Sequence, residues 1–338
     1  MKRNEKISPD PFGDWCTAEH VFRAQSVALA VRLARIGVKR VAIGISGGLD
    51  SALSLLVAAE AFGLLQLPLK NIYAYSMPGF GTTGRTRGNA ETLCKELGVS
   101  FETIDITRSC RLHFRDIGHD PSRHDTVFEN AQARMRTMIL MDKANQTGGI
   151  VLGTGDMSEI ALGWSTYNGD HMSMFGVNAG VPKTVVRRVC RWWAEHDAGS
   201  SRRRARAARA ILDIIDTPVS PELLPAKRGR IVQKTEDAIG PYELHDFFIW
   251  RAVVCGEKRR AIAAAAEKAF VGIYSVAEIE KWLEVFCRRL VTQAFKRNCA
   301  PDGIKVFPAY FGPHDWYIPS DTPYDGDIVQ PVVSRRRK

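Results

Sequence analysis

The sequence has no long hydrophobic run and no closely paired cysteines. None of its apolar stretches approaches the ~20 residues of a membrane-spanning helix. The charged residues 1–15 are not followed by the apolar segment of a secretory signal. The 7 cysteines are dispersed without a CxxC pair, which argues against a disulfide framework and against structural zinc. We therefore expect a cytoplasmic protein with reduced thiols and no membrane contact.

Acidic residues are fewer than basic ones, 37 against 47, which gives a net charge of +10. Much of the excess lies in RRRARAAR at 202–209 and in RRRK at 335–338. A basic helix could bind the phosphates of nucleic acid. However, no aromatic residues alternate with these arginines to stack on bases. A solvated helix face and a disordered basic tail are the favoured interpretation, so we do not expect a nucleic-acid partner.

Short apolar runs alternate with helical patterns from residue 41 onward. The runs predict buried strands at 41–45, 71–77, 99–106 and 150–155. Helical patterns occupy 51–63, 85–98 and 129–149. This alternation predicts an α/β fold, a doubly wound parallel sheet with helices on both faces. Ligands of such sheets bind at the carboxyl ends of the strands, here at the loops 46–51, 76–84 and 153–159.

The pattern becomes helical beyond residue 182, with helices predicted at 182–196 and 275–290. Residues 300–338 are rich in proline, aspartate and aromatics without periodicity, so we expect an extended tail over the surface. The predicted organisation is a helical lead-in at 1–40, one main domain at 41–306 and the tail at 307–338.

The segment GISGGLDS at 44–51 follows a predicted strand but lacks the lysine of a nucleotide-hydrolysing P-loop and the GxGxxG of a dinucleotide loop. Gly47 and Gly48 let the backbone approach an anion closely. Ser46 and Ser51 add hydroxyl groups, and the next helix directs its first amides to the same place. These groups predict a pocket for a polyanion of the size of pyrophosphate.

Asp50 would repel phosphate unless a cation lies between them, so we expect it to hold Mg²⁺. A loop that binds pyrophosphate as a leaving group favours attack at the α-phosphate of ATP, which is adenylation. The alternative is a glycine-rich turn without a ligand, but the full SGGxDS string after a buried strand is more specific than that.

SGGLDS resembles the pyrophosphate loop of the N-type ATP pyrophosphatases, which include NAD, GMP and asparagine synthetases and several tRNA-modifying enzymes. Further segments resemble the synthetase domain of NAD synthetases, of the kind usually fused to a glutaminase. They are MPGFGTTGRTRGNA at 77–90, FENAQARMRT at 128–137, GGIVLGTGDMSEIALGWSTY at 148–167, VNAGVPKT at 177–184 and AFKRNCAPDGIKV at 294–306. The resemblance runs from about residue 20 to residue 306 with the motifs in order.

This resemblance implies an adenine nucleotide α-hydrolase-like fold with a helical C-terminal part. It implies that ATP adenylates the nicotinate carboxylate of deamido-NAD, with release of pyrophosphate, and that ammonia then displaces AMP to give NAD. The implied ATP site comprises Gly44, Ile45, Ser46, Gly47, Gly48, Leu49, Asp50, Ser51, Thr154, Lys183 and Ser220. The implied substrate site comprises Asn130, Arg134, Glu159, Trp164, Ser165, Thr166, Tyr167 and Lys296.

The resemblance gives catalytic roles to Asp50 and Lys183, and metal-binding roles to Asp50 and Glu159. The chemistry of the second step, which consumes ammonia, indicates a catalytic role for Asp170 as well. Lys183 would reach an ATP phosphate. Asp170 would bind ammonium and help to remove its proton, although a turn-forming aspartate after Asn168-Gly169 is the alternative. Glu159 could instead be an ordinary first-turn glutamate stabilised by the helix dipole.

Two other residues of the substrate segments also have simpler alternatives. Trp164 could stack on the nicotinate ring or belong to the core. Arg134, one helical turn after Asn130, could face the dinucleotide or solvent.

The chain departs from the fused relatives because only about forty residues precede the first strand, too few for a glutaminase domain. Free ammonia, a separate glutaminase subunit and a truncated piece of a longer protein all remain open. The family also implies a homodimer, whose interface completes the dinucleotide site. Two other functions stay open: a tRNA-modifying enzyme that would use the helix at 202–209, and a non-catalytic nucleotide-binding subunit.

Overall fold

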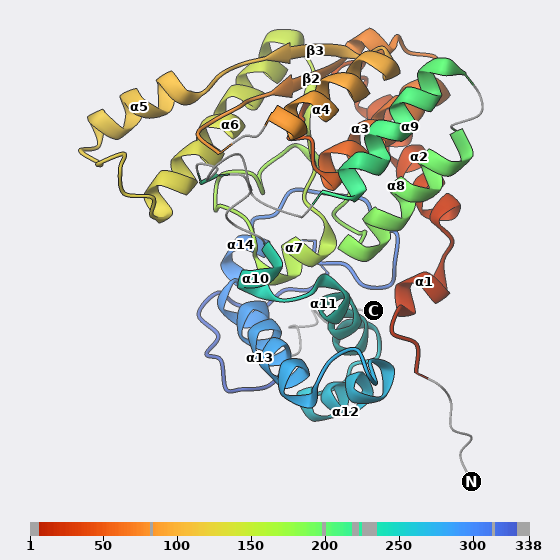
Figure 1. Ribbon diagram of the computed structural model, residues 1–338, viewed down its shortest axis with the longest axis vertical. Coiled ribbons are helices and arrows are strands. Elements are labelled where there is room, and N and C mark those ends of the chain that lie inside the picture. Colours follow the sequence, from red (N-terminus) through yellow and green to blue (C-terminus); the bar gives the residue numbers. More distant parts are fainter. Residues whose placement is uncertain are drawn as a thin grey trace, which may run out of the picture.

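A five-stranded parallel sheet organises the molecule (Figure 1). The computed structural model describes residues 7–81, 84–197, 201–217, 223–224, 235–312 and 315–329. The strands are β1 (Val41–Gly44), β2 (Ile72–Ser76), β3 (Ser100–Thr103), β4 (Ile150–Gly153) and β5 (Phe175–Gly176), in the order β3-β2-β1-β4-β5. Val41 of β1 pairs with Ile72 on one side and with Ile150 on the other. The strand order reverses between β1 and β4, and such reversals are where parallel sheets bind ligands.

Helices cover both faces of this sheet, as predicted. Those up to residue 215 are α1 (Pro11–Trp15), α2 (Ala18–Ile36), α3 (Leu49–Leu64), α4 (Gly84–Leu97), α5 (Thr107–Asp116), α6 (Thr126–Thr147), α7 (Met157–Leu162), α8 (Lys183–Asp197) and α9 (Arg202–Ile215). Alternate side chains of β1 separate the two faces: Val41 and Ile43 join the main core with α2, α3 and α8, whereas Ala42 packs on the α6 side. In the described part of the chain, no helix is long and apolar enough to cross a membrane.

The four predicted strands are confirmed, with boundaries shifted by a few residues. The strand β5 was not predicted, because two residues are too few to show an alternating pattern. The helix α3 begins at Leu49 rather than at residue 51, so Asp50 lies in its first turn. This places the Asp50 carboxylate beside the glycine loop instead of within it.

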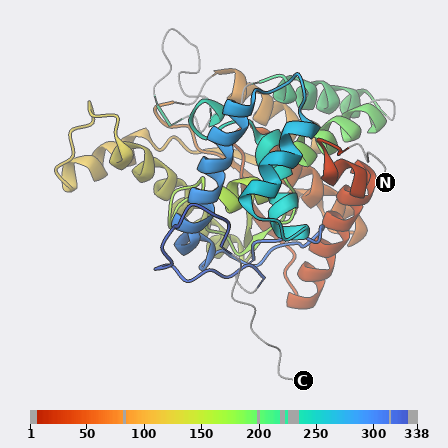
Figure 2. The same cartoon turned by 90° about the horizontal axis from the view of Figure 1, so that it is seen from below.

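The C-terminal part is helical, as predicted, and lies below the sheet in Figure 1. Its helices are α10 (Thr235–Ile239), α11 (Tyr242–Ile249), α12 (Arg259–Ala269), α13 (Val276–Thr292) and α14 (Ala294–Arg297). Viewed from below in Figure 2, α11, α12 and α13 lie in front of the sheet domain, and α5 projects to one side. The main hydrophobic core is continuous between the two parts: Leu53 of α3 and Phe248 of α11 belong to the same cluster.

The described residues after 300 are extended, as predicted, but they do not lie only on the surface. They form no helix or strand there, but Phe307, Phe311 and Ile318 are buried in the main core. The Asp327 carboxylate accepts the backbone N–H of Arg259 at 2.9 Å, which fixes the end of the segment. Burial of an irregular segment leaves no periodic pattern in the sequence, so its path could not be predicted. The basic end at 335–338 lies outside the described residues.

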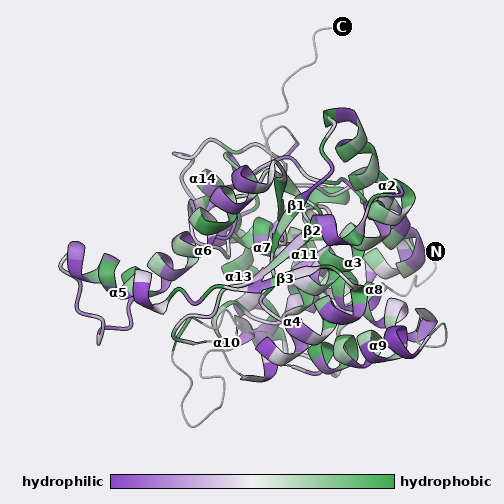
Figure 3. Ribbon diagram, turned by 90° about the horizontal axis from the view of Figure 1, so that it is seen from above, coloured by the Kyte–Doolittle hydropathy of each residue, from purple (hydrophilic) through white to green (hydrophobic). Residues whose placement is uncertain are grey.

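The arginine-rich helix α9 is only partly a solvated face. Its apolar side, which includes Ala207 and Ile211, belongs to the main core, so hydrophilic and hydrophobic residues alternate along the helix (Figure 3). Arg206 forms two hydrogen bonds with Glu96 of α4, at 2.7 and 3.0 Å. At the other end of α9, Asp213 accepts hydrogen bonds from Arg85 and Asn89 of α4. The helix therefore fixes α4, which lies against the glycine loop.

Candidate active site

The glycine loop connects β1 to α3 and folds tightly against the start of α4. Gly47 has φ 85°, and a Cβ atom there would lie 2.1 Å from the Thr86 carbonyl oxygen, so only glycine fits. The Gly48 N–H donates to Ser46 Oγ at 3.1 Å, and Ser51 Oγ donates to the Gly48 carbonyl at 3.1 Å. Gly48 caps α3 without a side chain, which leaves the first amides of α3 accessible to an anion.

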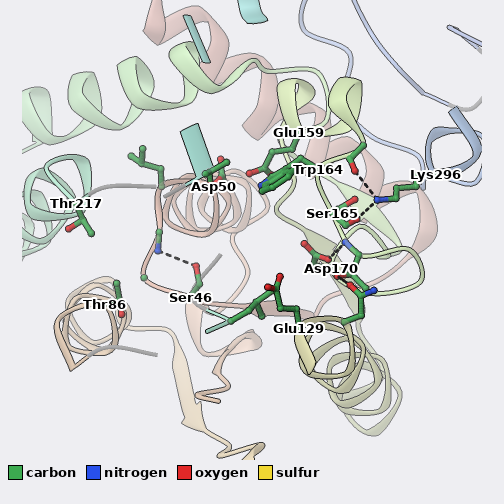
Figure 4. Close-up of a pocket in the computed structure, with 18 of the residues that line it drawn as sticks. Ser46, Asp50, Thr86, Glu129, Glu159, Trp164, Ser165, Asp170, Thr217 and Lys296 are labelled. Carbon is green, nitrogen blue, oxygen red and sulfur yellow. Dashed lines mark hydrogen bonds between the residues drawn. The ribbon is translucent and has the colours of Figure 1, made fainter. Parts of the chain in front are cut away.

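A cavity of about 310 Å³ opens beside this loop (Figure 4). Its lining includes most of the residues predicted for the phosphate and substrate sites: Ser46, Gly47, Gly48, Leu49, Asp50, Asn130, Glu159, Trp164, Ser165, Thr166, Asp170 and Lys296. A second cavity of about 260 Å³ is lined by Gly44, Ile45, Ser51 and Thr154, and it shares Ser46, Glu159 and Asp170 with the first. The two cavities therefore adjoin at the switch point between β1 and β4.

Two predicted residues, Arg134 and Tyr167, lie elsewhere. Arg134 is exposed and donates from Nε to the Tyr167 carbonyl at 3.2 Å, and the Tyr167 ring stacks on His171 with centroids 5.6 Å apart. Neither Arg134 nor Tyr167 lines the cavities described above. Ser220 lies outside the described residues.

Lys183 is buried beneath the cavity, with 2 % of its side chain exposed. Its Nζ lies 2.7 Å from Asp50 Oδ2, 2.7 Å from Asp156 Oδ2 and 2.9 Å from Glu159 Oε1. Burial opposes the charge, but the three carboxylates outweigh burial and raise the pKa of Lys183 well above its ordinary value. In this arrangement Lys183 contacts three carboxylates and is not among the residues that line the two cavities.

The three carboxylates carry more charge than one ammonium can balance. Burial, together with the neighbouring carboxylates, raises the pKa of Glu159 to about 7 and the pKa of Asp156 well above its usual range. Bound protons or a divalent cation can supply the missing positive charge.

The donor set fits Mg²⁺. The carboxylate oxygens of Asp50, Asp156 and Glu159 lie within 4.8 Å of one another, and Asp50 Oδ1 is buried without a hydrogen-bond partner among the described residues. Asp50 and Glu159 also line the cavity, where phosphate oxygens could complete the coordination of a hard cation.

Sequence reasoning missed Asp156, the third carboxylate of this cluster. Asp156 is the N-cap of α7 and accepts the backbone N–H of Glu159 at 2.9 Å. The sequence did indicate its role as a helix cap, because an aspartate three residues before Glu159 is typical of a helix start. Nothing in the sequence indicated that its second oxygen would face Lys183, because that contact depends on how α7 and α8 pack.

Asn178 was also missed, although it belongs to the motif VNAGVPKT. Its buried side chain donates to the backbone carbonyls of Asp50 at 2.9 Å and Thr154 at 3.1 Å, and Gln25 donates to its Oδ1 at 2.9 Å. These bonds tie the loops after β1 and β4 to each other and to α2. The motif was recognisable from sequence, but the direction of the amide was not.

Cationic side chains bind the backbone carbonyls of residues 162–165, in the segment predicted to contact the substrate. Lys296 Nζ donates to the carbonyls of Gly163 at 2.9 Å and Ser165 at 2.7 Å, and Arg289 Nε donates to Leu162 at 2.9 Å. The Arg289 guanidinium also lies 5.3 Å from the Trp164 ring centroid. The cations therefore fix the end of α7 and present Trp164 to the cavity (Figure 4).

Asp170 closes the same loop by accepting the backbone N–H of Thr166 at 2.8 Å. The Thr166 hydroxyl donates to Asn130 Oδ1 at 2.7 Å, which joins the loop to α6. Although solvent reaches Asp170 through the cavity, burial by the surrounding protein raises the pKa of its carboxyl. Asp170 is thus both a turn residue and a cavity residue, and the two predicted roles are compatible.

A parallel sheet with a glycine loop and a carboxylate cluster at its switch point identifies an α/β protein of the adenine nucleotide α-hydrolase-like fold. Residues 21–217 match the family model described as NAD synthase, and the chain belongs to this family. It is 40% identical over 324 residues to a glutamine-dependent NAD(+) synthetase of Mycobacterium leprae, with 89% of this chain and 47% of that protein covered. A glutamine-dependent NAD(+) synthetase of Thermotoga maritima is 31% identical over 310 residues, with the same shares covered.

The chain thus spans about half the length of these relatives. Among solved structures, the glutamine-dependent NAD(+) synthetase of Cytophaga hutchinsonii matches with a TM-score of 0.70 at 19% identity, covering 89% of this chain and 53% of that one. NMN synthetase of Francisella tularensis matches with a TM-score of 0.59 at 21% identity, covering 81% and 96%. These structural likenesses establish the fold alone.

Proposed function

We propose that this chain converts deamido-NAD to NAD in two steps, using ATP and ammonia. ATP adenylates the nicotinate carboxylate with release of pyrophosphate, and ammonia then displaces AMP. One observation carries the proposal: the glycine loop, the carboxylates Asp50 and Glu159, and the segment that begins at Trp164 all line one cavity. A phosphate site and a site for an aromatic acid within one cavity suit transfer of an adenylyl group between them.

The chain's own groups have separable roles in adenylation. The amides after Gly48 would bind the leaving pyrophosphate, and the adjoining cavity at Gly44 and Thr154 would hold the rest of ATP. The exposed face of Trp164 would stack on the nicotinate ring and direct its carboxylate toward the α-phosphate. When bound by Asp50 and Glu159, Mg²⁺ supplies charge neutralisation at the phosphates.

A small third cavity, of about 90 Å³, supports the use of ammonia in the second step. It is lined by Asp170, Ser173 and Lys296 and shares Glu159 with the main cavity, and its size suits a few water-sized molecules. Ser173 Oγ is buried there without a hydrogen-bond partner among the described residues, so it is available to a small polar molecule. Asp170 would accept the proton that ammonium loses.

The use of ammonia as the nitrogen donor, the binding of Mg²⁺ and the assembly of two chains into a homodimer are all parts of this proposal. The relatives named above are glutamine-dependent, and this chain covers about half of their length, so the ammonia could come from solution or from a glutaminase. The substrate is also a proposal, because an NMN synthetase shares the fold.

The test is to incubate the purified chain with ATP, Mg²⁺, ammonium and deamido-NAD and to measure NAD, AMP and pyrophosphate. Equal amounts of the three products are expected, with less product when nicotinate mononucleotide replaces deamido-NAD and none when glutamine replaces ammonium. Asp50→Asn should abolish the reaction, whereas the exposed Glu102→Gln, in the distant ion pair with Lys143, should not. Pyrophosphate release that does not depend on deamido-NAD would contradict the proposed substrate. A folded chain that forms no NAD would contradict the activity.

A further inference from the structure

Asp246 is a buried acid on α11 that belongs to none of the cavities described above. The residue is 3 % exposed, and the three groups that donate to its carboxylate are neutral. The Ser158 hydroxyl donates to Oδ1. The Thr184 N–H and hydroxyl donate to Oδ2 at 2.9 and 2.7 Å. A carboxylate at such a depth is costly unless its hydrogen bonds are worth more than those of a neutral acceptor.

These donors come from α7, which carries Glu159, and from α8, which begins with Lys183. Ser158 lies in α7, immediately before Glu159, and Thr184 lies in the first turn of α8, immediately after Lys183. The two helices are joined a second time, because Ser158 Oγ also accepts the backbone N–H of Lys183 at 2.9 Å. One carboxylate on α11 therefore sets the position of α7 relative to the start of α8.

We propose that Asp246 is a positioning residue that holds α7 and α8 in the register that places the Lys183 ammonium among its three carboxylates. The contact distances at Lys183, 2.7 to 2.9 Å, leave little room for one helix to slide along the other. Asp246 lies beyond residues 21–217, the part matched by the family model, and α11 packs on both α7 and α8. The helical C-terminal part thus acts on the site through a buried contact.

The chemistry of the carboxylate explains why an amide would serve less well. Asparagine has one acceptor oxygen and one NH₂ group, so in Asp246→Asn a side chain facing Thr184 with its oxygen would turn its NH₂ toward Ser158. The Ser158 hydroxyl would then have to accept from both the amide and the Lys183 N–H. Asp246→Asn should therefore keep the packing but weaken the link between the helices, and Ser158→Ala should remove the link while keeping the charge of Asp246.

The first test does not depend on enzymatic activity. Lys183 in the full-length wild-type chain should resist acetylation by an N-hydroxysuccinimide ester, because it reacts only after local opening. Asp246→Asn and Ser158→Ala should raise its labelling rate by ~10-fold or more, measured by mass spectrometry on protein with native circular dichroism. His245→Gln is the matched control, because His245 is adjacent, fully buried and bonded to the Ile239 carbonyl instead.

Equal protection of Lys183 in wild type and in folded Ser158→Ala would overturn the proposal, as would equal loss of protection in His245→Gln. If Asp246→Asn does not fold, Ser158→Ala decides, since it deletes only one oxygen atom.

A second test rests on the proposed function. Misplacement of a site group by ~1 Å costs ~10²-fold in rate, so Asp246→Asn and Ser158→Ala should lower kcat for pyrophosphate release by about that factor. The KM for deamido-NAD should change little, because neither residue lines the cavity. A rise in KM without a fall in kcat would contradict a role through Lys183. If wild type makes no NAD but the labelling result holds, the proposed function is wrong and the positioning role stands.

Discussion

Replacing Lys183 by methionine tests the carboxylate cluster directly. Methionine keeps an apolar stem of similar length in the buried channel and removes only the ammonium. Asp50, Asp156 and Glu159 then have carboxylate oxygens within 4.8 Å of one another and no cation between them. Removing one partner of a buried ionic group costs ~3–5 kcal/mol, so we expect the free energy of unfolding to fall by about that amount near neutral pH.

The stability lost in Lys183→Met should depend on pH. Burial raises the pKa of Glu159 to about 7, above its unfolded value, so the native state binds more protons than the unfolded state between these values. This contribution to stability is present at low pH and is lost as pH rises through the folded pKa. Lys183 lowers the pKa of Glu159 and of Asp156, so its removal should raise both further. The deficit of Lys183→Met should therefore be smallest in mild acid and should grow toward alkaline pH.

The assay is urea unfolding of both proteins at three pH values between about 5.5 and 8, with and without Mg²⁺. A cation that binds the vacated carboxylates should restore part of the lost stability. Lys143→Met is the control, because Lys143 forms a partly exposed ion pair with Glu102 at 3.0 Å and should cost less than ~1 kcal/mol. If Lys183→Met is no less stable than this control, or its deficit does not change with pH, the cluster is not held together by charge.

Three further predictions concern the glycine loop, Asp170 and the buried His245. Gly47→Ala should abolish ATP binding measured by calorimetry, because its methyl group would lie 2.1 Å from the Thr86 carbonyl, whereas Gly63→Ala, with no atom within 4 Å, should bind normally. Asp170→Asn should still catalyse substrate-dependent ATP–pyrophosphate exchange but form NAD ~10²–10⁴-fold more slowly, with partial recovery at alkaline pH; equal loss of both reactions without recovery would assign Asp170 to the turn alone. Burial lowers the pKa of His245 to about 4, so wild type should lose stability as pH falls from about 6.5 to 4, and His245→Gln should be less sensitive to acid by up to about 3 kcal/mol. Burial raises the pKa of Asp246 to about 6, and this opposes the loss of stability in acid equally in wild type and in His245→Gln. If both proteins lose the same stability as pH falls, His245 is not the cause of the acid sensitivity.

The features that sequence predicted follow local rules. The run VAIG and the loop after it combine a buried strand, glycines that permit close approach and a helix start, and each of these leaves a local signal. Thr154 and Glu159 were placed correctly near the loop because parallel strands bring their carboxyl ends to one edge. Lys183 was assigned to ATP, but it lies under three carboxylates, because its direction depends on the packing of α7 against α8. Asp246 left no signal of a role, since no helix was predicted around it and an aspartate is usually solvated.

The helix α7 shows why the sheet domain alone does not make this site. It carries Glu159 and is held near both ends by residues of the C-terminal part. Asp246 accepts a hydrogen bond from the Ser158 hydroxyl, and Arg289 and Lys296 donate to the backbone carbonyls of Leu162 and Gly163. An anion near the N-terminus of a helix and cations near its C-terminus both stabilise the helix, because they interact favourably with its dipole. A helix of six residues needs such support, since helices of that length are not stable on their own. The sequence of residues 44–51 is therefore enough to predict a glycine loop at the end of a strand. The position of Glu159 opposite that loop depends on helices that lie up to 138 residues further along the chain, counted from Glu159 to Arg297.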